Sequence, residues 1–439
     1  MRFFVHKLGC PKNDVDADYI SARLIHAGHS PVSDPEQAES IIVNTCGFIL
    51  SAKEESINEI LRLGQLKKHG SLQSLYAAGC LTQRYGDELL SGIPELDGAF
   101  GHGALDSIAE AVTSRSHLEK TVKMETRKLG YLSWKNRFIS DPYPYSYLKI
   151  SDGCDRACTY CAIPLMRGKF RSRPLDSILR EAQFLTENGK KEIILVSQEA
   201  TMWGYGLPEK PTIVDLLRAL ENVDGIEWIR LMYLYPAALD NVLIDYMLAD
   251  NKTLPYFDLP LQHASEPILN AMRRRVDQAH IERLLGRIRN SGVPATIRTT
   301  FIVGFPGETD GHFEELMEFT RKWEFDRMGA FTYSAEEGTP AEQMSEQVPE
   351  ELKVERMDRL MTLQQGLAFE KNQKLVGSVL DILLDTVDEN GIGTGRSKGD
   401  CPDIDQELFV TGTSLQAGGM YRVLVDSAEG YDLRGKVTE

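Results

Sequence analysis

Six apolar segments with the composition of β-strands alternate with helical segments between residues 147 and 334, and this alternation limits the fold more than any other feature. The strand-like segments are YLKIS, EIILVSQ, EWIRLMYL, YFDLPLQ, ATIRTTFIV and RMGAFTYS. Strands joined through helices run parallel. Because six such units exceed a small doubly wound domain, the sequence predicts a barrel or partial barrel with its site at the carboxyl ends of the strands.

The regions on either side have different patterns. Residues 1–130 alternate the strand-like RFFVHKL, SIIVNT and LYAAG with helical segments, which predicts an α/β domain with a parallel sheet. A Pro- and aromatic-rich stretch predicts a linker over 131–146, before the barrel at 147–348. A charged helical pattern at 349–373 predicts a connecting helix, and the short Gly- and Asp-punctuated strands of 374–439 predict a small antiparallel, OB-like β-barrel.

Composition narrows the functional class. The chain lacks a run of about 18 apolar residues, and Lys7 interrupts its first apolar stretch, so we expect a cytoplasmic protein without a membrane partner. A net charge of -16 argues against broad, unspecific binding to a phosphate backbone. Cytosolic thiols stay reduced, so seven unevenly spaced cysteines indicate metal binding or catalysis rather than disulfides.

Three of these cysteines lie within eight residues. Cys154, Cys158 and Cys161 follow the first strand of the predicted barrel, in ISDGCDRACTYCAIP. A structural zinc site takes four ligands in paired clusters, and no partner motif completes one here. Three thiolates on a four-iron cluster leave one iron without a protein ligand, and a small molecule can chelate that iron.

The CxxxCxxC spacing, with Tyr160 before the third cysteine, resembles the radical S-adenosylmethionine superfamily. The resemblance implies that the open iron binds the amino and carboxylate groups of S-adenosylmethionine, which an electron then cleaves to methionine and a 5′-deoxyadenosyl radical. It also implies cofactor contacts at the later strand ends, at Ser197, Gln198, Glu199, Arg298, Thr300, Gly304 and the neighbouring Glu308. For any one of these residues alone, an ordinary strand-to-helix turn explains the pattern equally well.

Cys10, Cys46 and Cys80 each follow an N-terminal strand, at a spacing of about one βαβ step. The carboxyl ends of parallel strands share one edge, so three thiols delivered there can converge on a second cluster. Any single one of them could equally be a small buried hydrophobe. Cys401 has no such partners and is expected to be an ordinary surface or loop cysteine.

These three regions together resemble the methylthiotransferase family of radical S-adenosylmethionine enzymes, whose last module is called TRAM. The resemblance covers essentially the whole chain. It implies two 4Fe-4S clusters, S-adenosylmethionine as both methyl donor and radical source, and an electron donor of the flavodoxin or ferredoxin type. One cluster would be held by Cys154, Cys158 and Cys161, and the other by Cys10, Cys46 and Cys80.

Two substrate types compete within that family: adenosine beside the tRNA anticodon, and an aspartate of small-subunit ribosomal protein twelve. LGCPKNDVDAD, PLMRGKFRSRP, LPLQHAS, AMRRR and GRSKGDCPDID resemble the ribosomal-protein type. The sequence departs from its usual pattern at Ala17, where Ser is common, and at Cys401 and Pro402 with the following DIDQE. These departures leave the chemistry untouched and bear only on contacts to the partner.

Charge separates the same two substrates. From Lys371 onward the chain carries seven basic and twelve acidic residues, a net -5 that suits a basic ribosomal protein better than tRNA phosphates. The basic stretches at 167–173 and 272–276, and His263, are explained equally well as solvated or core residues and as contacts to substrate. A tRNA methylthiotransferase and a non-enzymatic iron-sulfur or RNA-binding scaffold remain the alternatives.

Overall fold

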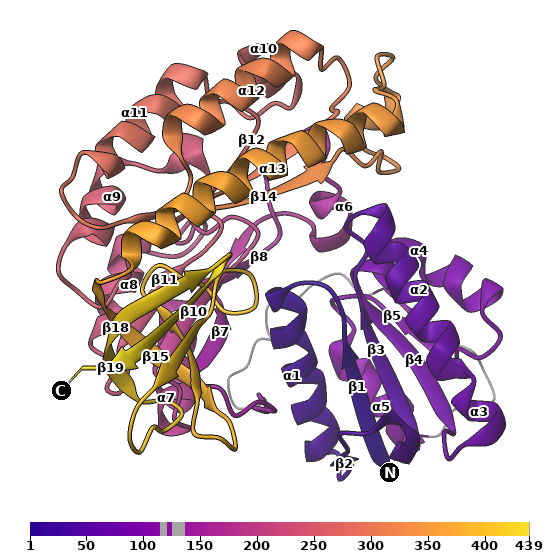
Figure 1. Cartoon of the computed structure of the whole chain (residues 1–439). Helices are drawn as coiled ribbons and strands as arrows, with labels where there is room; N and C mark the ends of the chain where they lie inside the picture. Colours follow the sequence, from indigo (N-terminus) through magenta and orange to yellow (C-terminus); the bar gives the residue numbers. More distant parts are fainter. Residues whose placement is uncertain (115–120, 125–136, 439) are drawn as a thin grey trace. The chain divides into compact units, whose positions relative to one another are not determined.

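The computed structural model describes residues 1–114, 121–124 and 137–438 (Figure 1). The chain forms two compact units. One contains Met1–Asp141, Lys149–Arg156 and Cys161–Glu181, and the other contains Pro142–Leu148, Ala157–Tyr160 and the chain from Ala182 onward. Residues 131–136 of the predicted linker lie outside the described residues.

The first unit is built on a six-stranded parallel sheet with the order β2-β1-β3-β4-β5-β6. The strands are β1 (Arg2–Lys7), β2 (Ser30–Pro31), β3 (Ser40–Thr45), β4 (Ser74–Gly79), β5 (Gly98–Phe100) and β6 (Thr121–Lys123). The helices are α1 (Pro11–His26), α2 (Leu50–Gly64), α3 (Leu66–His69), α4 (Cys80–Gly92) and α5 (Leu105–Ser114). Every residue of β3 and β4 is buried, as expected for a parallel sheet covered on both faces. The predicted parallel sheet is confirmed.

The same unit contains a short insertion around the CxxxCxxC segment. Strands β8 (Ser151–Asp152) and β9 (Arg171–Ser172) pair antiparallel, and the five-residue helix α6 (Ile163–Arg167) lies between them in the chain. Helix α7 (Leu175–Glu187) follows.

The second unit contains two three-stranded sheets, ordered β11-β10-β7 and β12-β13-β14, in which β10–β11, β12–β13 and β13–β14 pair parallel. Their strands are β7 (Tyr145–Lys149), β10 (Glu192–Val196), β11 (Trp228–Leu231), β12 (Tyr256–Gln262), β13 (Thr296–Val303) and β14 (Arg327–Thr332). The connecting helices are α8 (Ile213–Glu221), α9 (Asn241–Leu248), α10 (Glu266–Ala271), α11 (Gln278–Arg289) and α12 (Asp310–Trp323). All six predicted barrel strands are present.

Helix α13 (Glu350–Leu375) leads to a closed five-stranded barrel with the order β15-β16-β17-β19-β18 (Figure 1). Its strands are β15 (Val379–Val387), β16 (Gly393–Ser397), β17 (Leu408–Thr411), β18 (Met420–Glu429) and β19 (Asp432–Val437). Ile382, Leu408, Val423 and Leu433 belong to its apolar core. The predicted small β-barrel is confirmed, with β19 as an additional strand that pairs antiparallel with β18 but parallel with β17, so the barrel is not antiparallel throughout.

Among the described residues, no helix is both long and apolar enough to span a membrane.

A buried ion network joins this small barrel to the parallel strands. Glu192, the first residue of β10, accepts from Arg230 Nε at 2.7 Å and from Arg396 Nη1 at 2.6 Å, and Arg396 also pairs with Asp385 at 2.6 Å. Burial alone would raise the pKa of Glu192, but the two guanidinium groups hold it below its ordinary value. A carboxylate buried this completely depends on both partners.

We predict that Arg396→Met lowers the free energy of unfolding of the second unit by about 3–5 kcal/mol, because it leaves buried carboxylates without a partner. Urea denaturation followed by circular dichroism measures the change. Arg434→Met is the matched control, since Arg434 pairs with Glu429 at a site where both side chains are more than half exposed. Equal, small effects of the two substitutions would contradict a structural role for the buried network.

Candidate functional site

Cys10, Cys46 and Cys80 follow β1, β3 and β4, which are consecutive neighbours in the sheet. Cys10 is the N-cap residue of α1, and Cys80 is the first residue of α4. The neighbouring strands are parallel and in register, so their carboxyl ends present the three residues along one edge. The structure thus brings together the three cysteines that the sequence placed at equivalent strand ends.

Two glycines make this close approach possible. Gly9 has φ +93°, and a Cβ at this position would lie 2.7 Å from Cβ and 3.0 Å from Sγ of Cys46. Gly79 has φ +103°, and its Cβ would lie 2.6 Å from the carbonyl oxygen of Thr45. Both positions therefore require glycine for conformation and for space.

Burial and the neighbouring cysteines raise the pKa values of Cys46 and Cys80. Burial raises the pKa of Cys46 to about 12, with further contributions from Cys80 and Cys10. Burial likewise raises the pKa of Cys80, while Arg167 acts in the opposite direction. His102, itself buried, places Nε2 3.2 Å from Sγ of Cys80. The Cys46 and Cys80 thiols would therefore lose their protons to solvent at neutral pH only when a metal centre binds the resulting thiolates.

A buried charge cluster lies beside them. Arg167 contacts Asn13 Oδ1 at 2.7 Å, Asp16 Oδ2 at 3.0 Å and Asp152 Oδ1 at 3.3 Å, and Lys149 Nζ lies 2.6 Å from Asp16 Oδ1. Arg167 belongs to the basic stretch 167–173, whose role the sequence left open. It is 1% exposed and therefore belongs to the interior of this unit.

Within the described part of the chain, no three His, Cys, Asp or Glu side chains gather closely enough to hold a single metal ion. A four-iron cluster has a different requirement, because each thiolate binds a different iron. Cys10, Cys46 and Cys80 supply the thiolates that such a cluster binds, and the buried Arg167 beside them can offset its negative charge.

The CxxxCxxC cysteines share one short connection between β8 and α6. In the first unit, the Cys154 amide donates to the Gly168 carbonyl at 3.0 Å, and Sγ of Cys154 accepts from the Arg156 amide at 3.4 Å. Cys161 lies two residues before α6. Both are partly exposed, as expected of residues that face a ligand.

Cys158 and Tyr160 belong to the second unit, where Arg274 contacts both. Nη1 of Arg274 lies 3.6 Å from Sγ of Cys158 and 3.4 Å from the Tyr160 hydroxyl, and Nη2 donates to the Pro260 carbonyl at 2.5 Å. Although burial disfavours its charge, Tyr160 and Cys158 keep the pKa of Arg274 above its ordinary value. Arg274 comes from the basic stretch 272–276, and its burial excludes the solvated-face interpretation for this residue.

The predicted cofactor contacts after β10 are placed at that strand's carboxyl end. Ser197 is fully buried, and its Oγ has no hydrogen-bond partner among the described residues. Glu199 is buried and contacts the Thr201 hydroxyl, while Gln198 is partly exposed. The hydroxyl of Ser265, beyond the end of β12, likewise has no hydrogen-bond partner in the part of the chain that the structure describes. Unpartnered buried hydroxyls at this end of the strands fit a polar ligand there.

The predicted contacts on β13 fall into two groups. Thr300 is partly exposed in the strand, and Gly304 directly follows it with φ +73°. Glu308 is buried, accepts from the Gly304 amide at 2.9 Å and pairs with Arg356 at 2.8 Å. Arg298 lies near the opposite end of β13, five residues before Val303, and pairs with Asp258 and Asp405. The structure thus separates Arg298 from the strand ends that carry the other predicted contacts.

The structure shows what surrounds His263 and Cys401, whose roles the sequence did not determine. His263 is fully buried, accepts from the Ser265 amide at 3.0 Å and lies 3.3 Å from Glu308, which supports its interpretation as a capping residue. Cys401 is 1% exposed, so the expectation of an ordinary surface or loop cysteine was wrong as to exposure. Its neighbours include the buried Arg230 and Asp405.

Three family models match the chain: the radical SAM superfamily over residues 148–320, uncharacterized protein family UPF0004 over residues 2–101, and the TRAM domain over residues 376–438. A protein from Desulfitobacterium hafniense named ribosomal protein uS12 methylthiotransferase RimO is 42% identical over 98% of this chain and 97% of its own length. The protein of the same name from Thermosipho africanus is 43% identical, and the match covers 100% of each chain. This chain belongs to the RimO methylthiotransferase family.

Solved structures agree on the fold. The radical S-adenosylmethionine methyltransferase TsrM from Kitasatospora setae, with tryptophan and a SAM analogue bound, has a TM-score of 0.57 and 13% sequence identity, over 85% of this chain and 90% of TsrM. The TsrM structure with cobalamin and a [4Fe-4S] cluster bound has a TM-score of 0.55, over 87% and 76%. RimO membership confirms the resemblance that the cysteine motifs and domain order indicated.

We predict that Gly9→Ala destabilises the first unit by about 1–3 kcal/mol more than Gly28→Ala, because only the first substitution also forces a contact with Cys46. Gly28 has a similar φ of +87° with open space around it, so its substitution measures the conformational cost alone. Urea denaturation of both variants gives the difference. Equal costs would show that close packing does not restrict position 9.

Proposed function

We propose that this protein attaches a methylthio group to the β-carbon of an aspartate in ribosomal protein uS12. The observation that carries the proposal is similarity over essentially the full length to proteins named for this activity, at 42–43% identity. The reaction replaces a carbon-bound hydrogen with a sulfur and its methyl group. The two cysteine triads at strand carboxyl ends support a chemistry of this kind.

The two 4Fe-4S clusters would have different roles in the reaction. Cys154, Cys158 and Cys161 would hold the cluster that binds S-adenosylmethionine through its open iron and supplies the electron for cleavage. Cys10, Cys46 and Cys80 would hold the second, which carries the sulfur that receives a methyl group from another S-adenosylmethionine. A flavodoxin- or ferredoxin-type protein would supply the electrons.

The surrounding side chains would orient these groups. Arg274 would fix Cys158 and Tyr160 by its contacts to both, and Arg167 would offset the negative charge that gathers on Cys46 and Cys80. Ser197, whose buried hydroxyl has no partner among the described residues, is available to a polar part of S-adenosylmethionine. Gln198, Glu199, Thr300 and Gly304 remain candidates for the same pocket.

Several acidic residues of the terminal barrel are buried and are therefore unavailable to a basic partner. Asp385, Asp400 and Asp405 are largely buried and paired with arginines, so they do not form a docking surface. Asp381, Asp426 and Glu429 are about half exposed, and each already pairs with an exposed cation of the same barrel, so a basic protein would have to compete with Lys398, Lys436 and Arg434 for them. We place the reaction in the cytoplasm, where thiols stay reduced and ribosomal proteins are made.

One anaerobic experiment tests the substrate. The reconstituted protein receives S-adenosylmethionine, sulfide, a strong reductant, uS12 and bulk tRNA in one tube, and mass spectrometry determines which polymer exchanges hydrogen for a methylthio group. We expect the modification on an aspartate of uS12. Modification of tRNA adenosine instead would overturn the substrate assignment while preserving the cofactor roles, and an absence of S-adenosylmethionine consumption would favour a scaffold.

We predict that the two triads can be separated by substitution. Cys158→Ala should abolish reductive cleavage of S-adenosylmethionine, since it removes a ligand of the cluster that supplies the electron. Cys46→Ala should preserve cleavage and abolish methylthio transfer. Chromatography of 5′-deoxyadenosine and mass spectrometry of uS12 measure the two steps, and Cys401→Ala serves as the cysteine control. Equal loss of both steps in the Cys46 variant would contradict the division of roles.

A further inference from the structure

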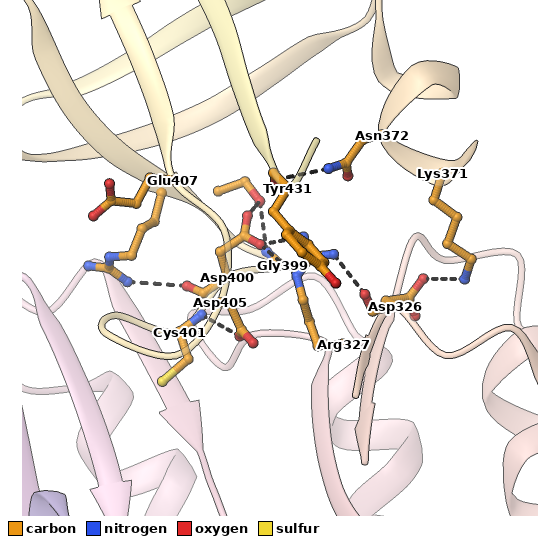
Figure 2. A network of polar contacts seen from close by, with 12 residues as sticks. Asp326, Arg327, Lys371, Asn372, Gly399, Asp400, Cys401, Asp405, Glu407 and Tyr431 are labelled. Atoms are coloured by element: carbon orange, nitrogen blue, oxygen red, sulfur yellow. Dashed lines mark hydrogen bonds and ion pairs between the residues drawn. The ribbon is translucent and has the colours of Figure 1, made fainter. Parts of the chain in front are cut away.

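The loop after β16 contacts three of the parallel strands at or near their amino-terminal ends, and Figure 2 shows its Asp400, Cys401 and Asp405 together with Arg327. The Lys398 carbonyl accepts from Arg230 of β11 at 3.0 Å, and Asp400 accepts from Arg327, the first residue of β14. Asp405 accepts from the hydroxyl of Tyr256, the first residue of β12, at 2.5 Å. This loop lies at the end of the strands opposite the predicted cofactor contacts.

Asp405 is a buried carboxylate of this loop with partners on three sides. Its Oδ2 accepts from Tyr256 and, at 2.8 Å, from the Cys401 amide, while Oδ1 lies 3.5 Å from Nε of Arg298. The Asp405 side chain is 1% exposed. Because both of its oxygens have partners and the side chain is buried, Asp405 has little freedom, and it restrains Arg298.

Arg298 continues the chain of contacts inward. Its Nη1 donates to Oδ1 of Asp258 at 3.1 Å, and the other oxygen of Asp258 accepts from the Tyr233 amide at 2.9 Å. Tyr233 has φ +63°, a left-handed conformation that is strained for an aromatic residue. Such a residue keeps this conformation only when its surroundings hold it, and the Asp258 carboxylate does so here.

Tyr233 in turn holds the turn after β10. Its carbonyl oxygen accepts from the Ala200 amide at 3.1 Å. Ala200 directly follows Ser197, Gln198 and Glu199, the residues proposed to receive S-adenosylmethionine. A continuous series of contacts therefore runs from the terminal barrel through β13, β12 and the end of β11 to this turn.

We infer that Arg298 is a positioning residue that, fixed by Asp405 and acting through Asp258 and Tyr233, holds the 197–200 turn in its binding conformation. The sequence placed Arg298 among the cofactor contacts, and its location assigns it this indirect role instead. Asp405, in the loop after β16 of the terminal barrel, thereby helps to keep the proposed cofactor pocket ordered. The role in S-adenosylmethionine binding rests on the proposed function, whereas the support of the turn does not.

The neighbouring Arg327 provides a matched control. Arg298 and Arg327 are direct partners in the β13–β14 register, and each pairs with a carboxylate of the same loop. Only Arg298 also contacts Asp258. Loss of either arginine removes a loop contact, but only loss of Arg298 frees the carboxylate that holds Tyr233.

The test compares Arg298→Met, Arg327→Met and Asp405→Asn in the cluster-loaded protein. Hydrogen-deuterium exchange is measured without S-adenosylmethionine, and equilibrium binding of S-adenosylmethionine is measured separately. Arg298→Met should speed amide exchange at Tyr233 and Ala200 about tenfold and weaken S-adenosylmethionine binding by a similar factor. Asp405→Asn, which retains an acceptor oxygen, should cause a smaller change in the same direction.

Arg327→Met should leave exchange at both amides and S-adenosylmethionine binding unchanged. Unchanged exchange at Tyr233 and Ala200 in Arg298→Met and Asp405→Asn would overturn the inference, as would equal acceleration in Arg327→Met. Faster exchange with unchanged S-adenosylmethionine binding would overturn the positioning role and leave the proposed function standing, because mass spectrometry of uS12 tests that function independently.

Discussion

Parallel pairing of strands is the constraint on which this structure depends, because it places the carboxyl ends of successive strands along one edge. In the first unit this pairing brings Cys10, Cys46 and Cys80 together from positions about 35 residues apart. In the second unit Ser197 follows β10 and Ser265 lies beyond β12, each past the carboxyl end of a strand of its own sheet. Residues far apart in sequence share a site because the backbone hydrogen bonds of the sheet fix where each strand ends.

Much of this arrangement follows from the sequence. Apolar strands such as SIIVNT are fully buried between helices, so their composition alone marks them, and β3 has the limits of that segment. Strand β19 was not predicted because charged residues and a glycine interrupt the apolar pattern of DLRGKV. Leu433 is its one fully buried apolar side chain. Strand β5 is only three residues long and has too few positions to show a period.

Buried charges were the harder part of the site to predict. Arg167 and Arg274 lie in basic stretches that the sequence explains equally well as solvated faces and as contacts to substrate, whereas each is buried against cysteine or carboxylate partners from distant segments. The partners of Arg298 show the same difficulty, since Asp405 is more than a hundred residues away. Sequence patterns reveal apolar periodicity, whereas the pairing of a buried charge depends on tertiary contacts.

Iron analysis of anaerobically reconstituted protein is the sharpest test of the proposal that each cysteine triad holds a four-iron cluster. We predict about eight irons per chain in the wild type and about four when Cys10, Cys46 and Cys80 are all replaced by alanine, with Mössbauer spectra of the remainder typical of one cubane cluster. The same iron content in the wild type and in this triple variant would contradict the claim, because the N-terminal thiols would then bind no cluster.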